Sequence, residues 1–509
     1  MQLGFVIDHS RCIGCHACTV ACKSENEVPL GDFRTWVKYT EEGTFPDVKR
    51  SFAVLRCNQC TDAPCIEICP TSALTKGPQG IVDIQSKVCI GCKSCMHGCP
   101  YDALYINEEE GTAEKCHFCA HRTEMGLAPA CAVVCPTEAI IPGDFHDPES
   151  MVSQMKRDYD LSARKEEAGT GPNVFYRDVE PAGIDPALTN ISTGSIWSEL
   201  PEGPHVDAQI FEALEKKAEA RTVYDVPRKQ LWGNKITGYL FAKSISAGLF
   251  PLGVLAIGSM VDVSAVTRWM VPLLAVIALA VTGGLLIGDL RRPDRFFLIL
   301  IRPNWSSWLA RGTVAISVYG GLLVAWMALL LFKGPEDSAL RGLLFWMTTG
   351  FALATSAYTG WLFGQAKGRV LWMKRGYWAH LLCQAGVGGA GTLLLLYPIL
   401  DITGSGLDLL RFALAMSIIG HAAFTFLEGR CAPAGREKEF HRAARLITHG
   451  PYAKRHWREG VLLGIVLPLI LLSIFSNPLL LLVAGGFALY GLWVEEDVFV
   501  RAGQALPIS

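Results

Sequence analysis

Residues 89–100 read CIGCKSCMHGCP, a run of four cysteines spaced Cys-x2-Cys-x2-Cys-x3-Cys, with a proline directly after the fourth. At this spacing three thiolates can wrap one face of an iron–sulfur cubane. The fourth thiolate, three residues further on, points the other way and ligates a neighbouring cluster. The proline suits the start of the short helix that carries the chain away. The run therefore predicts a small fold built around paired clusters.

Three further runs of four cysteines accompany this one. They are Cys12-x2-Cys15-x2-Cys18-x3-Cys22, Cys57-x2-Cys60-x4-Cys65-x3-Cys69-Pro70 and Cys116-x2-Cys119-x11-Cys131-x3-Cys135-Pro136. Together the runs supply sixteen soft thiolates, enough for four 4Fe–4S clusters. Zinc accepts the same ligands, but zinc sites pair two separated Cys-x2-Cys knuckles and do not repeat this spacing. We therefore expect iron–sulfur clusters rather than zinc sites or structural cysteines.

Charge and cysteine content divide the 509-residue chain into two chemically different parts. Residues 1–230 carry 22 Lys and Arg against 34 Asp and Glu, whereas residues 231–509 carry 24 against 14. Such a division excludes one soluble globular domain. Tight Cys-x2-Cys runs in a long chain also exclude a disulfide-stapled secreted fold. We expect no nucleic-acid partner, because the cysteine-rich part is acidic and the basic residues lie between apolar runs.

Long apolar runs begin near residue 236. We place them at 236–259, 269–288, 313–332, 342–363, 377–398, 409–427, 460–476 and 478–494. Most reach the ~20 residues that cross a bilayer as a helix, and backbone polar groups in lipid must be satisfied within the helix. The sequence therefore predicts an all-α bundle of eight transmembrane helices. It also predicts a multi-pass protein of the bacterial or archaeal inner (cell) membrane.

The loops between these helices carry positive charge unevenly. The loops after the second, fourth and sixth runs hold 17 Lys and Arg, whereas the loops after the first, third, fifth and seventh hold only three. By the positive-inside rule the basic side is cytoplasmic. With eight spans both ends of the membrane part lie on that side. We therefore expect the cysteine-rich part to be cytoplasmic, in keeping with an N-terminal segment that shows no export signal.

The cysteine runs resemble those of the four-cluster ferredoxin-type subunits that serve molybdopterin oxidoreductases, such as the dimethyl-sulfoxide and polysulfide reductases, over about residues 1–200. The resemblance implies an α+β double bacterial-ferredoxin-like domain in which run one pairs with run four and run two with run three. Spacing alone leaves the pairing of adjacent runs open. The implied ligands are Cys12, Cys15, Cys18 and Cys135 for cluster one; Cys22, Cys116, Cys119 and Cys131 for cluster two; Cys57, Cys60, Cys65 and Cys99 for cluster three; and Cys69, Cys89, Cys92 and Cys95 for cluster four.

The membrane part resembles the polysulfide-reductase-type (NrfD-like) integral subunits. The resemblance rests on DLRRPDRF at 289–296, RPNWSSW at 302–308 and WVEEDVFVRAGQALP at 493–507. Such subunits exchange electrons with quinone and bind no haem. The resemblance implies menaquinone or ubiquinone from the membrane quinone pool as cofactor. It also implies a large catalytic subunit that carries the molybdopterin on a separate chain.

Polar residues within the apolar runs mark the candidate quinone site, because such residues are costly in lipid and are functional by default. A quinone headgroup needs hydrogen-bond partners for its two carbonyls and a proton route. Hydrogen bonding between helices and snorkelling at the interface remain alternatives for each residue. Two histidines within the runs could also ligate one haem. The candidates for quinone are Lys243, Asp289, Tyr358, His380, Gln384, His421 and Glu428.

We divide the chain into an iron–sulfur domain at 1–145, an extension and linker at 146–235, and a membrane anchor with a quinone site at 236–509. We interpret it as the electron-transfer and quinone-reactive subunit of an oxidoreductase complex, with the main substrate site and all its catalytic residues on another chain. One alternative is that the same row of clusters carries electrons for a hydrogenase or formate dehydrogenase. Another is a redox-linked proton-translocating membrane protein.

Overall fold

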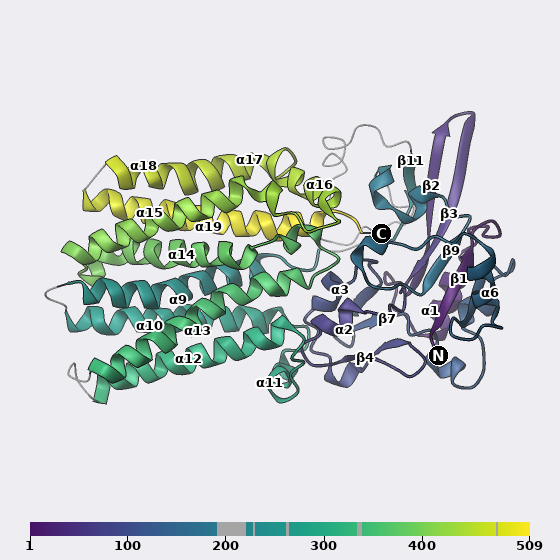
Figure 1. Ribbon diagram of the computed structural model, residues 1–509, viewed down its shortest axis with the longest axis horizontal. Helices are drawn as coiled ribbons and strands as arrows, with labels where there is room; N and C mark the ends of the chain where they lie inside the picture. The colour runs from purple at the N-terminus through teal and green to yellow at the C-terminus, as the bar shows by residue number, and fades with distance from the viewer. Residues whose placement is uncertain (191–219, 227–229, 261–263, 333–337, 475–476, 509) are drawn as a thin grey trace.

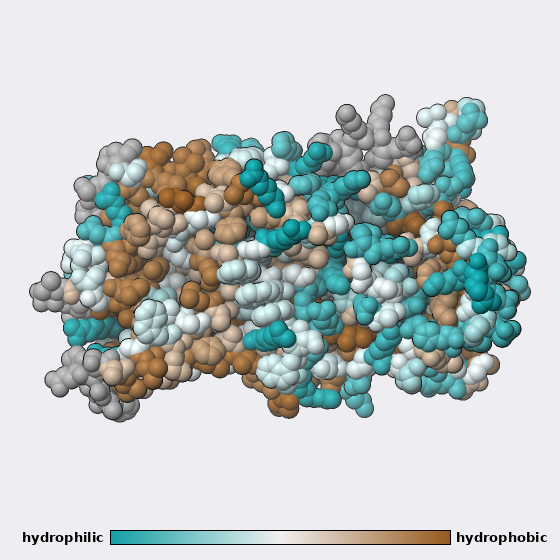
Figure 2. Space-filling model, viewed as in Figure 1, coloured by the Kyte–Doolittle hydropathy of each residue, from teal (hydrophilic) through white to brown (hydrophobic). Residues whose placement is uncertain are grey.

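The computed structural model describes residues 1–190, 220–226, 230–260, 264–332, 338–474 and 477–508. It consists of two halves that lie end to end along the long axis of the molecule (Figure 1). One half is α+β and contains the cysteine runs, and the other is a bundle of long helices. Figure 2 shows apolar residues concentrated over the bundle and hydrophilic residues over the α+β half. This arrangement confirms the fold class expected from the sequence.

Two sheets and two hairpins make up the β-structure. The first sheet has the order β8 (Ile140–Asp144), β1 (Leu3–Asp8), β9 (Val174–Arg177). The second has the order β10 (Thr189–Asn190), β11 (Ala220–Tyr224), β2 (Thr35–Thr44), β3 (Asp47–Arg56). The hairpins pair β4 (Leu74–Lys76) with β5 (Val82–Ile84) and β6 (Leu104–Asn107) with β7 (Thr112–Lys115). Strands β9, β10 and β11 follow residue 145, so residues beyond the cysteine runs complete both sheets.

Short helices carry many of the cysteines. They are α1 (Ala17–Glu25), α2 (Pro64–Ile68), α3 (Ser94–Gly98), α4 (Ala120–Thr123) and α5 (Ala130–Val133), with α6 (Met151–Asp158) and α7 (Pro181–Ile184) after the last run. Helix α1 packs against α5, and α2 packs against α3. Since α1 belongs to the first cysteine run and α5 to the fourth, while α2 and α3 belong to the second and third, the fold joins the outer pair of runs and the inner pair.

The bundle consists of long helices that run roughly along the molecular axis (Figure 1). In chain order they are α9 (Asn234–Gly258), α10 (Ala265–Asp289), α12 (Trp308–Phe332), α13 (Ser338–Gly364), α14 (Tyr377–Leu400), α15 (Gly404–Phe426), the continuous stretch of α17 (Ala453–Arg455), the π-helix His456–Val466 and α18 (Leu467–Ile474), and α19 (Pro478–Ala505). Shorter helices α11 (Leu298–Ile301) and α16 (Glu437–Thr448) lie in the loops.

Seven helices of the described residues are long and apolar enough to cross a membrane, and α13 is the long helix that falls short. Helix α13 is less apolar because it carries buried Thr355, Ser356 and Thr359. The start of the first bundle helix, α9, nevertheless contacts the end of the last one, α19. The Trp232 amide donates to Gln504 Oε1 at 3.0 Å, and Gln504 Nε2 donates to the Trp232 carbonyl at 2.9 Å. Because α9 starts where α19 ends, we expect an even number of crossings, with α13 as the eighth.

Two predicted helix boundaries were wrong. The seventh helical stretch begins at Ala453 rather than near 460, and α19 continues to Ala505 rather than ending near 494. The apolar runs stop earlier than the helices because charged residues follow. These charges are buried with partners: Asp497 accepts from Arg501 Nε at 2.8 Å, and Glu495 Oε2 lies 3.1 Å from His456 Nδ1. Paired charges at a helix end let the helix continue past its apolar run.

Candidate functional site

The sixteen cysteines of the four runs come together in four sets. All are free thiols. Beyond the effect of burial, nearby thiolates raise the pKa of a thiol and so identify its neighbours. Cys135 and Cys15 act in this way on Cys12, and Cys99 acts on Cys60. We group the cysteines by the nested assignment that the resemblance implies, in which Cys12 goes with Cys135 and Cys60 with Cys99: Cys12, Cys15, Cys18 and Cys135; Cys22, Cys116, Cys119 and Cys131; Cys57, Cys60, Cys65 and Cys99; and Cys69, Cys89, Cys92 and Cys95. We number these sets one to four.

The four sets form a row. Burial raises the pKa of the Cys18 thiol of set one, and so does Cys131 of set two. Burial likewise raises the pKa of Cys57 of set three, with Cys116 of set two as a further cause. Cys95 of set four has Cys65 of set three among its neighbours. Each set therefore borders the next, in the order one, two, three, four.

The residue before the second cysteine of each run has a left-handed backbone. Its φ is +70° at Gly14, +44° at Gln59, +65° at Gly91 and +60° at Phe118. A left-handed residue in a tight turn forms a concave nest of backbone N–H groups that binds anions, including iron–sulfur clusters. All four loops thus share a cradle shape. The described residues contain no group of three or more His, Cys, Asp or Glu arranged to hold a single metal ion.

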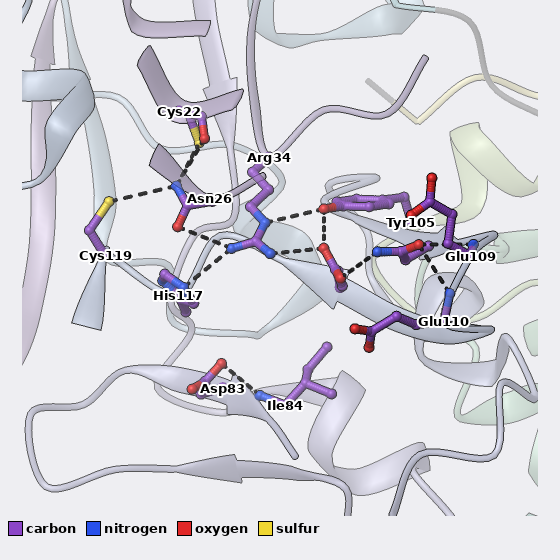
Figure 3. Close-up of polar contacts among 12 residues, drawn as sticks. Cys22, Asn26, Arg34, Asp83, Ile84, Tyr105, Glu109, Glu110, His117 and Cys119 are labelled. Atoms are coloured by element: carbon purple, nitrogen blue, oxygen red, sulfur yellow. Dashed lines mark hydrogen bonds and ion pairs between the residues drawn. The ribbon is translucent and has the colours of Figure 1, made fainter. Parts of the chain in front are cut away.

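All four cysteines of set two lie in the wall of one small cavity. Figure 3 shows one side of this wall. Asn26 Nδ2 lies 3.6 Å from Cys22 Sγ, and Arg34 Nη1 donates to Asn26 Oδ1 at 3.3 Å. Arg34 is itself held by Glu114 Oε2 at 2.8 Å. The hydrogen-bonded wall fixes the shape of a space that opens onto four thiols.

The loop after α10 joins the two halves. Arg291 Nη2 donates to Glu108 Oε1 at 3.1 Å, and Arg295 Nη1 donates to the Ser86 carbonyl at 2.7 Å and the Cys89 carbonyl at 3.1 Å. Asn304 Nδ2 donates to the Cys69 carbonyl at 2.8 Å. Two of these carbonyls belong to cysteines of set four. The basic loop therefore docks the α+β half, with set four next to the bundle.

A cavity of about 230 Å³ lies where set four meets the bundle. Cys92 forms part of its wall, and α9, α10, α12 and α13 supply most of the rest. The wall is mostly apolar, with a few polar groups such as Tyr239 and Asp289. An apolar space with a few convergent polar groups is typical of a small-molecule site. Its position beside Cys92 makes it the candidate quinone pocket.

The predicted quinone residues separate into three places. Asp289 lines the pocket, but its carboxylate accepts from Lys93 Nζ at 3.0 Å across the junction of the halves. Tyr358 and Lys243 lie one layer behind the pocket wall. The Tyr239 and Tyr358 hydroxyl oxygens are 2.6 Å apart, and Lys243 Nζ donates to Thr359 Oγ1 at 2.6 Å.

The remaining candidates lie further away, among α14, α15 and the loop after α15. His380 Nε2 and His421 Nδ1 are 2.8 Å apart, so the two imidazoles hydrogen-bond directly to each other. Glu428 accepts from Lys374 Nζ at 3.1 Å. Gln384 is buried on α14. None of these four residues is part of the described pocket wall.

Sequence reasoning missed three residues that connect these places. Tyr239 is the pocket residue that contacts the inner layer. Glu496 is buried, accepts from Ser244 Oγ at 3.4 Å and is the electrostatic neighbour of Lys243. Glu495 faces His456. The available signal was the glutamate pair that directly follows the last apolar run. Judged by its apolar residues alone, that run ends at residue 494, so the pair falls outside it.

Comparison with known proteins agrees with this geometry. Residues 48–145 match the 4Fe-4S dicluster domain, and residues 222–507 match the family described as polysulphide reductase, NrfD. The arsenate respiratory reductase iron-sulfur subunit of Shewanella sp. is 38% identical over 35% of this chain and 96% of its own length. One subunit of the tetrathionate reductase of Salmonella typhimurium is 41% identical over 39% of this chain and 81% of its own. One chain of the polysulfide reductase of Wolinella succinogenes is 37% identical over 36% of this chain and 98% of its own.

The NrfD family model covers more than half of the protein, including the bundle. The protein thus combines an iron–sulfur electron-transfer part with a multi-pass membrane anchor. The chain therefore belongs to the polysulphide reductase NrfD family, with a 4Fe-4S dicluster domain fused ahead of the membrane domain on one polypeptide.

Proposed function

We propose that this chain conducts electrons between a membrane quinone and a separate molybdopterin catalytic subunit. The observation that carries the proposal is the position of Cys92, which belongs to a row of cysteine sets and also lines the apolar pocket. A quinone in this pocket would sit beside the last set of the row. The proposal thus places the quinone at one end of the row of clusters that conducts the electrons.

The four sets would hold four 4Fe–4S clusters, with the nested ligand assignment that the resemblance implies. Support comes from the four left-handed loops and the thiol-lined cavity of set two. Such clusters supply one-electron transfer when bound. The chain's own residues place the sets in a row and exclude water, because most of the cysteines are buried.

The pocket would take menaquinone or ubiquinone, with its isoprenoid tail along the apolar wall. Tyr239 would hydrogen-bond the headgroup and exchange its proton with the inner layer of Tyr358, Thr359 and Lys243. Glu496, which accepts from Ser244 Oγ at 3.4 Å directly after Lys243 in the chain, would come next in the series. Quinol oxidation releases two protons with its two electrons, so a buried series of titratable groups beside the pocket suits this chemistry.

The catalytic partner would dock at the opposite end of the row, over set one. Cys15 is exposed there, and so are large apolar side chains nearby in sequence: Ile13 is 58% and Val20 is 64% exposed. Exposed apolar side chains beside a redox centre suit a protein interface. The relatives' names include an arsenate respiratory reductase and a tetrathionate reductase. A molybdopterin partner of this kind is therefore the proposed electron donor or acceptor.

We expect the iron–sulfur half to face the cytoplasm, because the basic loops lie on its side of the bundle. A C-terminal fusion tests this, since α19 ends beside the iron–sulfur half. A fluorescent-protein fusion should fluoresce in cells, and an alkaline-phosphatase fusion at the same point should be inactive. Active phosphatase would place the iron–sulfur half on the other side of the membrane.

Quinol reduction of the clusters tests the wire directly. A reduced quinol added anaerobically to the membrane-embedded complex should reduce the clusters, as followed by electron paramagnetic resonance. A quinone-site inhibitor should block this reduction, whereas dithionite should still reduce the clusters. Clusters that dithionite reduces but quinol never reaches would contradict the proposal.

A further inference from the structure

Arg56, at the end of β3, carries a buried charge that the electron path does not itself need. Its side chain is fully buried, and Nη1 donates to Cys131 Sγ at 3.2 Å. Its Nε and Nη2 atoms are buried with no hydrogen-bond partner in the described part of the chain. The guanidinium lies 4.3 Å from the centre of the Phe5 ring. The one hydrogen-bond acceptor of this side chain among the described residues is therefore a cysteine sulfur.

Arg56 lies between sets one and two. Burial alone would lower its pKa, but the thiolates of Cys131, Cys116 and Cys18 outweigh burial and raise the pKa. Cys18 belongs to set one, and the other two belong to set two. A guanidinium is always charged, and a fully buried charge without an anion is strongly unfavourable. The site is stable only if anionic groups on both sides compensate the charge.

Lys115 repeats this arrangement one junction further along the row. It is buried, its Nζ donates to the carbonyls of Val82 and Cys116, and the second of these contacts measures 2.6 Å. Burial lowers its pKa, but the thiolates of Cys57, Cys116 and Cys65 reverse this effect. Cys57 and Cys65 belong to set three and Cys116 to set two. Lys115 therefore lies between sets two and three.

Two other buried cations of this half, Arg34 and Lys93, differ in having carboxylate partners. Arg34 pairs with Glu114 at 2.8 Å, and Lys93 pairs with Asp289 at 3.0 Å. Neither Arg56 nor Lys115 makes such an ion pair within the described residues. Each also directly precedes the first cysteine of a run, Cys57 or Cys116. The charge of each is thus free to act on the sulfur-ligated groups around it.

We propose that Arg56 and Lys115 set the reduction potentials of the clusters, each raising the potential of the two clusters that it borders. Reduction adds one negative charge to a cluster, and a buried cation stabilises that charge more strongly than a solvated one. Arg56 would act on clusters one and two, and Lys115 on clusters two and three. Cluster two borders both cations and would gain most. Cluster four borders neither.

This inference rests on the proposed function, because it needs the four clusters. The test is a potentiometric titration of the purified complex, followed by electron paramagnetic resonance, in the wild type, Arg56→Gln, Lys115→Met and the double variant. Each single variant should lower two of the four midpoints. The double variant should lower three, and the midpoint shared by both single variants should fall by the sum of the two shifts. The unmoved midpoint should be the one lost in Cys92→Ser.

Conservative and distant variants serve as controls. Arg56→Lys and Lys115→Arg keep the charge and should shift the same midpoints less than the neutral variants do. Arg177→Gln removes a guanidinium that pairs with Asp8 at 3.1 Å, and it should leave all midpoints unchanged. If Arg56→Gln does not assemble its clusters, Arg56→Lys and Lys115→Met carry the test.

Unchanged midpoints in fully assembled variants would overturn the inference and leave the wire intact. A uniform shift of all four midpoints would also overturn it. Wild-type protein with iron and acid-labile sulfide far below the content of four clusters would overturn the proposed function instead. The iron assay and the titration therefore separate the two failures.

Discussion

Gly283→Trp is expected to slow quinol-driven cluster reduction by about 100-fold while leaving the clusters in place. Gly283 lies in the wall of the pocket beside Cys92, and a Cβ added there meets no other atom within 4 Å. The indole would enter the pocket without displacing neighbouring helices. Losing about four buried CH₂ contacts at ~0.8 kcal/mol each weakens quinone binding by ~3 kcal/mol, on the order of 100-fold.

Gly284→Trp provides the matched control. It lies one residue further along α10, is exposed, and also has no atom within 4 Å of an added Cβ. Gly284 is not part of the described pocket wall. The control should reduce its clusters at the wild-type rate, and dithionite should reduce the clusters of both variants equally. Equal quinol rates in the two variants would place the quinone outside this pocket.

The cysteine chemistry could be predicted from sequence because it depends on local spacing. Cys89, Cys92 and Cys95 lie within seven residues, so any compact turn brings their thiols together. The partner of Cys12 is Cys135, far away in sequence, and spacing alone does not distinguish it from a cysteine of an adjacent run. The packing of α1 against α5 makes that choice. Local motifs therefore predict the kind of site, and long-range packing determines which cysteines share one site.

The quinone candidates were harder to predict because depth along a helix does not determine direction around it. Asp289 and His380 both lie near the end of the bundle that faces the iron–sulfur half. Asp289 lines the pocket, whereas His380 faces His421. Tyr239 reaches the pocket from α9 although its sequence context is ordinary. To predict which residues line a pocket, one must know how each helix is rotated about its axis and which helices are its neighbours. A span that is apolar on all sides shows no periodicity from which this rotation could be inferred.

The arginine-rich loop shows why charge patterns need a structure. Positive charge by itself suits two roles for this loop, binding of lipid headgroups and docking of the acidic half. Arg291, Arg292 and Arg295 all contact the iron–sulfur half, and Arg292 Nη1 donates to the Glu110 carbonyl at 3.3 Å. These charges hold the two halves together. Because these arginines also hold the two halves together, their number is weaker evidence for the cytoplasmic side than the positive-inside rule alone suggests.

Glu496→Gln is expected to slow quinol-dependent turnover by on the order of 100-fold, because general acid–base groups typically contribute 10²–10⁴. Glu496 is buried on α19, and its Oε2 atom has no hydrogen-bond partner in the described part of the chain. It accepts from Ser244, the chain neighbour of Lys243; Lys243 contacts Thr359, and Tyr239 completes the connection to the pocket. An amide in this position keeps the shape of the carboxylate but cannot exchange the proton.

The readouts should separate proton transfer from electron transfer. Glu496→Gln should keep its full iron content and its reduction by dithionite, and its slow turnover should show a larger solvent isotope effect than the wild type. Glu459→Gln makes the same chemical change at an exposed glutamate that pairs with Arg455, and it should leave turnover unchanged. Lys243→Met is a poorer probe, since it removes a buried cation together with its hydrogen bonds to the Ser356 carbonyl and Thr359 Oγ1. Wild-type turnover in Glu496→Gln would remove this residue from the proton path and leave the pocket prediction untouched, because Gly283 and Glu496 act on different steps.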